Sequence, residues 1–163
     1  MNKHDKALDI LDGMLQIADN EMITKGIYYK EECERPDLKD QICGGHRACL
    51  IGSMWVAALV RPKKLEYWDE LTLPGVEYGE DRDEFLKRRP GLRLAYNALN
   101  EAAERRLVKI SPDWEKNEVD FSTNNVGADA GPAEFLFENT DFGTTRGDLK
   151  RLIRSAIKVV EKA

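Results

Sequence analysis

Apolar residues recur at helical spacing along much of the chain. In residues 4–20 an apolar stripe of Leu8, Leu11, Leu15 and Ala18 returns every three or four positions. Residues 46–60 are apolar on nearly every face, and Pro62 ends the stretch. Because a helix that is apolar all round must be buried, residues 46–60 are predicted to form a central helix.

Three further helices are predicted in the second half. A short one covers residues 81–88, the next runs from Pro90 to about residue 107, and the last begins at Thr145. Alternating apolar residues in 108–121 and the apolar run 134–137 predict short strands. The predicted fold is mainly α, with four or five helices packed around a buried central helix at about 46–60 and at most a small β element.

Length and composition are consistent with one globular domain that covers residues 1–163. The longest apolar stretch, residues 48–60, is shorter than the roughly 18 residues that span a bilayer. The first residues lack the apolar core of a signal peptide, and three cysteines are too few for a disulfide scaffold. We therefore expect a soluble, cytoplasmic protein that does not enter a membrane.

Negative charge is concentrated between residues 66 and 84, where Arg82 is the only basic residue. Aromatic and apolar side chains are interleaved with the acids, which is typical of protein-binding surfaces. The competing interpretation is that these rings pack onto the core of the protein itself. The predicted partner-binding residues are Tyr67, Trp68, Asp69, Glu70, Leu71 and Tyr78.

Basic residues repeat every four positions in the last predicted helix, at Lys150, Arg154, Lys158 and Lys162. Such a stripe is able to contact nucleic acid or an acidic protein. No helix-turn-helix, zinc-finger or RNA-binding signature accompanies it. The simpler interpretation is the solvated side of an amphipathic helix.

Cys33, Cys43, His46 and Cys49 are residue types that bind zinc. The paired C-x-x-C spacing is missing, and Cys49 lies in an apolar segment where a thiol is usually a small hydrophobe. A catalytic thiol is the other option, with Cys49 acidified by a helix N-terminus and by His46. Structural cysteines are favoured, so no metal and no other cofactor is expected.

Several segments together carry a resemblance to a known family. They are Lys-Gly-Ile-Tyr at 25–28, Cys-Leu-Ile-Gly-Ser at 49–53, Pro-Gly-Leu-Arg-Leu-Ala-Tyr-Asn-Ala-Leu at 90–99 and Asn-Thr-Asp at 139–141 before the last helix. In this order they resemble a family of small uncharacterised bacterial and bacteriophage proteins, a domain of unknown function. The resemblance implies a fold but no activity, and it identifies no site residues.

The sequence therefore favours a non-enzymatic protein-interaction or accessory protein, encoded by a bacteriophage and binding a cellular target. One alternative is a small metal- or thiol-dependent enzyme that uses Cys43, His46 and Cys49. The other is a nucleic-acid-associated accessory protein that uses the basic stripe of the last helix.

Overall fold

The structure is a computed structural model that describes residues 1–19, 23, 29–30, 47–59, 82–120, 122, 126–143 and 145–163. Its α-helices are α1 (Lys3–Asp19), α2 (Leu50–Leu59), α3 (Arg82–Lys87), α4 (Pro90–Ile110), α5 (Pro132–Asn139) and α6 (Arg146–Lys162). Short 3-10 turns occupy Trp114–Lys116 (η4) and Ala128–Ala130 (η5). The two-residue strands β1 (Tyr29–Lys30) and β2 (Arg47–Ala48) pair antiparallel, with Tyr29 opposite Ala48.

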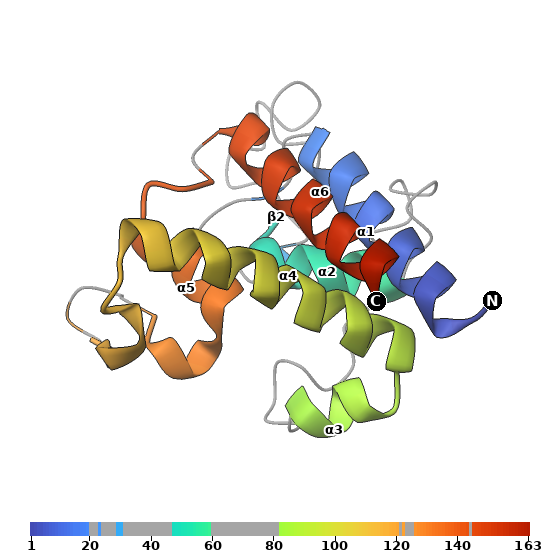
Figure 1. Cartoon of the computed structure of the whole chain (residues 1–163), viewed down its shortest axis with the longest axis horizontal. Helices are drawn as coiled ribbons and strands as arrows, with labels where there is room; N and C mark the ends of the chain where they lie inside the picture. Colours follow the sequence, from blue (N-terminus) through green and yellow to red (C-terminus); the bar gives the residue numbers. More distant parts are fainter. Residues whose placement is uncertain are drawn as a thin grey trace.

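The fold is built by packing helix against helix, which confirms the mainly α prediction. Helix α4 packs against α1, α3, α5 and α6, and α1 also packs against α6 and α2. In Figure 1, α1 and α6 lie side by side and cross α4, while α5 lies beside the C-terminal half of α4. The α4 helix therefore joins most of the other helices into one core.

The predicted buried helix exists and is shorter than expected, since it begins at Leu50. Every described side chain from Leu50 to Ala57 is buried, so no face of this part of α2 is left to solvent. Its largest side chain, Trp55, stacks on Tyr96 of α4 and meets Phe85 of α3 edge to face. The ring of Trp55 thus links α2 to the neighbouring helices.

The strand predictions are wrong for residues 108–110 and for residues 134–137. Helix α4 continues through Val108 to Ile110, and the amide of Ser111 still donates to the carbonyl oxygen of Leu107. Residues 134–137 belong to helix α5, whose first residue is Pro132. A run as short as Phe135-Leu136-Phe137, in which all three side chains are buried, has no period that separates strand from helix.

The start of α6 follows the predicted capping pattern. The Thr145 hydroxyl accepts a hydrogen bond from the amide of Asp148 at 3.2 Å. Gly143, just before this cap, has a φ of +86°, and a Cβ there would lie 2.8 Å from the Phe137 ring. A glycine is therefore required where the chain turns from α5 into α6. Among the described helices, none is long and apolar enough to cross a membrane.

Candidate functional site

A groove runs between the second half of α4 and helix α6. It consists of two adjoining hollows of about 380 and 310 Å³ that share Arg105 and Ser155. Glu101 of α4 lies in one hollow with Lys162, and Lys109 of α4 lies in the other with Arg151. The two helices are therefore antiparallel along what we call the α4–α6 groove.

The α4–α6 groove is strongly cationic. Two acids line it, Glu101 and Asp148, against six bases: Arg105, Arg106, Lys109, Arg151, Lys158 and Lys162. Each acid already binds one arginine, at 2.9 Å between Glu101 and Arg105 and at 2.5 Å between Asp148 and Arg151. The groove thus has an excess of positive charge after its own ion pairs are formed.

Four bases of the groove hold the uncompensated charge: three lysines, and Arg106, whose guanidinium lies over the Phe142 ring. Lys109, Lys158 and Lys162 are exposed, and none forms an ion pair with another residue that the structure describes. The floor between them is partly apolar, with Leu152 and Val159 of α6. Such a surface is able to attract an acidic ligand and also to cover an apolar side chain.

The predicted basic stripe of the last helix does not form one face. Lys150 turns toward α1, where its Nζ lies 2.7 Å from the Asp19 carboxylate, and Arg154 also acts on Asp19. Lys158 and Lys162 line the α4–α6 groove instead. The reason is geometric: a step of four residues overshoots a helical turn by about 40°, so three steps move the side chain by about 120°.

The Lys150 side of α6 is therefore occupied by contacts within the protein. Lys150, Arg146 and Arg154 together lower the pKa of Asp19, mainly through the hydrogen bond from Lys150. The guanidinium of Arg146 also donates to the carbonyl oxygen of Asp19 at 2.9 Å. These bases fasten the end of α1 to the start of α6.

The contribution of α4 to the groove was not predicted from the sequence. Arg105, Arg106 and Lys109 lie near the end of the predicted helix, where bases are ordinary partners of the helix dipole. Their charges were visible in the sequence. Their position opposite Lys158 and Lys162 was not, because about fifty residues separate the two groups along the chain.

A half-buried polar cluster lies elsewhere, where α3, α4 and α5 meet. The guanidinium of Arg82 donates to the Glu134 carboxylate at 3.4 Å, to the Tyr96 hydroxyl at 3.3 Å and to the carbonyl oxygen of Ala130 at 3.2 Å. Burial raises the pKa of Glu134, although Arg82 opposes this effect. We interpret the cluster as a structural tie, since one side chain of α3 holds α4, η5 and α5.

Cys49 has the environment of an inert thiol. Its side chain is buried beside α2, and its sulfur accepts a hydrogen bond from the amide of Gly52 at 3.3 Å. Burial raises the pKa of Cys49 to about 12, so the reactive thiolate is scarce at neutral pH. Cys33, Cys43 and His46 lie outside the described residues. Within the part of the chain that the structure describes, no three His, Cys, Asp or Glu side chains are grouped to hold a metal ion.

The predicted partner-binding segment is also outside the described residues. This applies to all six of its members: Tyr67, Trp68, Asp69, Glu70, Leu71 and Tyr78. Their role as an interaction surface stays a prediction from the sequence. The α4–α6 groove is accordingly the candidate site whose geometry is described.

Comparison of the chain with protein-family models, curated proteins and solved structures finds no match.

Proposed function

We propose that the protein is a non-enzymatic accessory protein that binds an acidic segment of a partner protein in the α4–α6 groove. The observation that carries the proposal is the excess of six bases over two acids along two antiparallel helices. Clustered charge of one sign raises the rate of encounter with an oppositely charged partner and sets its orientation. A cellular target and a bacteriophage origin come from the family resemblance alone.

The groove fits an acidic protein segment better than it fits a nucleic acid. Leu152 and Val159 in its floor would contact apolar side chains of a partner, and phosphates have no such groups. Phe142 lines the groove, but the Arg106 guanidinium lies 5.5 Å from the centre of its ring. Arg106 would therefore compete with a nucleobase of DNA or RNA for stacking on the Phe142 ring.

The thiol-dependent enzyme is less well supported than either binding function. Its nucleophile would be Cys49, which is buried and has a raised pKa. A nucleophilic cysteine needs access and a lowered pKa. The proposal therefore assigns Cys49 to the core.

The direct test removes the three lysines of the groove, which form no ion pair within the described part of the chain. The variant Lys109→Gln/Lys158→Gln/Lys162→Gln is compared with Lys87→Gln/Arg93→Gln/Lys116→Gln, which loses the same charge from exposed positions outside the groove. The probe is a fluorescein-labelled helical peptide of glutamate and leucine, followed by anisotropy. We expect the groove variant to bind the peptide about tenfold more weakly, since each exposed pair contributes modestly. The control variant should stay near the wild type.

Two outcomes would overturn the proposal. If the groove variant and the control variant lose peptide affinity equally, only the net charge of the protein matters. Tighter binding of a labelled DNA duplex than of the peptide, with the duplex released by the groove variant, would favour the nucleic-acid alternative. A salt titration supports this distinction, because the affinity for DNA falls steeply with salt.

A further inference from the structure

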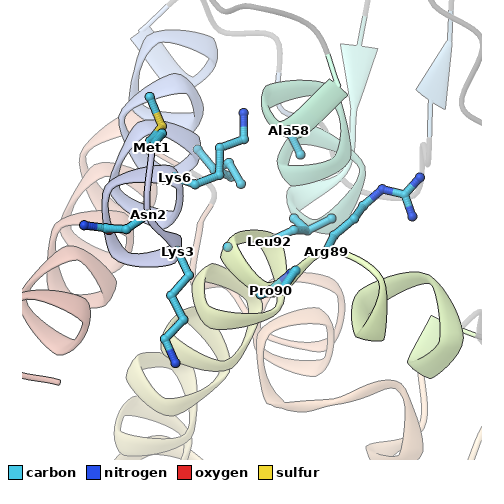
Figure 2. A pocket seen from close by; sticks show the side chains of 10 residues that line it. Met1, Asn2, Lys3, Lys6, Ala58, Arg89, Pro90 and Leu92 are labelled. Atoms are coloured by element: carbon cyan, nitrogen blue, oxygen red, sulfur yellow. The ribbon is translucent and has the colours of Figure 1, made fainter.

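A separate pocket lies at the other end of α4, where the first turns of α1 and α4 meet the end of α2. It encloses about 390 Å³, within the range of small-molecule sites. In Figure 2 the side chain of Lys6 lies between α1 and α2 on the side of Ala58, whereas the ends of Lys3 and Arg89 point away from it and from each other. This pocket shares no lining residue with the α4–α6 groove.

Gly91 sets the close approach of the two helices at this pocket. A Cβ at Gly91 would lie 2.6 Å from the Cβ and Cγ atoms of Lys6 and 3.3 Å from the carbonyl oxygen of Lys3. Only a residue without a side chain lets α4 begin so close to α1. The stem of Lys6 is therefore held beside the pocket.

The rim of the pocket is basic. Lys3, Lys6 and Arg89 line it, and among the described residues no carboxylate does. Neither Lys3 nor Lys6 forms an ion pair with any residue that the structure describes. Arg89 is fixed in place, since its guanidinium donates to the carbonyl oxygen of Phe85 at 3.2 Å and lies 4.0 Å from the centre of the Phe85 ring.

The inner wall of the pocket is apolar, with Ile10 of α1, Ala58 of α2 and Leu92 of α4. An inorganic anion would leave this wall uncovered. A neutral apolar molecule would leave the two lysines without a counter-charge. The first turns of α1 and α4 add the positive ends of two helix dipoles to the field at the rim.

We propose that the pocket binds a small amphiphilic carboxylate. Its carboxylate lies at Lys6, and its aliphatic chain lies against Ala58, the one of the three wall residues that is not almost fully buried. The size of the pocket favours a short or medium chain over a full-length lipid. Binding here is independent of the partner proposed for the α4–α6 groove.

The test uses sodium octanoate as the probe and the amide resonances of the intact chain as the readout. Octanoate should shift the amides of Gly91, Leu92 and Ala58 in a saturable manner. Acetate carries the same charge without the chain, and 1-octanol carries the chain without the charge. Both should bind more weakly than octanoate.

Three variants make the assignment specific. Lys6→Met keeps the methylenes beside Gly91 but removes the charge, and we expect octanoate affinity to fall about three- to tenfold. Ala58→Leu should fill the apolar wall and abolish binding. Lys109→Met removes one lysine from the α4–α6 groove and should bind octanoate as the wild type does.

The proposal fails if octanoate binds no better than acetate and octanol, or if Lys6→Met and Lys109→Met have the same effect. Lys3→Met gives a second charge removal in case Lys6→Met disturbs the contact with Gly91. If the wild-type protein binds octanoate but does not bind the acidic peptide, the proposed function alone is overturned.

Discussion

Trp55 carries an unusual polar atom for a side chain at the centre of the core. Its ring is fully buried, stacks on Tyr96 with centroids 6.0 Å apart, and meets Phe85 at 5.3 Å. Its indole Nε1 is also buried and has no hydrogen-bond acceptor among the residues that the structure describes. The substitution Trp55→Phe keeps an aromatic ring at this position and removes the unpaired N–H group.

Two opposing contributions decide the effect of Trp55→Phe on stability. Besides the N–H group, phenylalanine lacks two ring carbons of tryptophan. Loss of these buried carbons lowers the free energy of unfolding by about 1.6 kcal/mol, and the void that they leave lowers it by about 1 kcal/mol more. An unsatisfied buried donor is itself unfavourable by about 1–3 kcal/mol, and the substitution relieves this penalty. We therefore expect the free energy of unfolding to change by about 1 kcal/mol or less.

Leu50→Ala, in the same helix, is the control for Trp55→Phe. Leu50 is fully buried and has no polar atom in its side chain, so nothing offsets the cavity. We expect a loss of about 2–5 kcal/mol in urea denaturation followed by circular dichroism. A loss above about 3 kcal/mol for Trp55→Phe would show that the indole N–H has an acceptor in solution and would refute the reasoning.

Three further predictions address the cysteine, the buried carboxyl group and the acidic segment. In a Cys33→Ser/Cys43→Ser background, the buried Cys49 thiol with its pKa near 12 should react with iodoacetamide only as fast as the protein unfolds, and rapid labelling of the native state would contradict this. Burial raises the pKa of Glu134 above its usual 4.5, so the folded state binds its proton more tightly than the unfolded state does. Lowering the pH from 7 to 5 should therefore stabilise the wild type relative to Glu134→Gln in urea titrations, and the opposite trend would show that the arginine partner outweighs burial. Trp68→Ala should leave the melting temperature nearly unchanged but abolish capture of a cellular partner, whereas a large drop in stability with capture intact would place Trp68 in the core.

Local periodicity was sufficient to predict most of the helices. The stripes of α1, α4 and α6 are read from side chains three and four residues apart, which share a face in any helix. The cap at Thr145 is equally local, because its partner is the amide of Asp148 three residues on. Helix α5 was predicted incorrectly because a short, fully buried run has no polar face to reveal its period.

The binding surfaces were decided by tertiary structure. Lys150 to Lys162 look like one stripe in the sequence, but the twist of the helix sends Lys150 to α1 and Lys162 to α4. The α4–α6 groove exists only because packing of the two apolar faces brings Arg105 beside Lys158. Likewise, the pocket between Lys6 and Arg89 depends on the contact that Gly91 permits between two helices distant in the chain. A sequence contains these charges, but their distances from one another follow from how the helices pack.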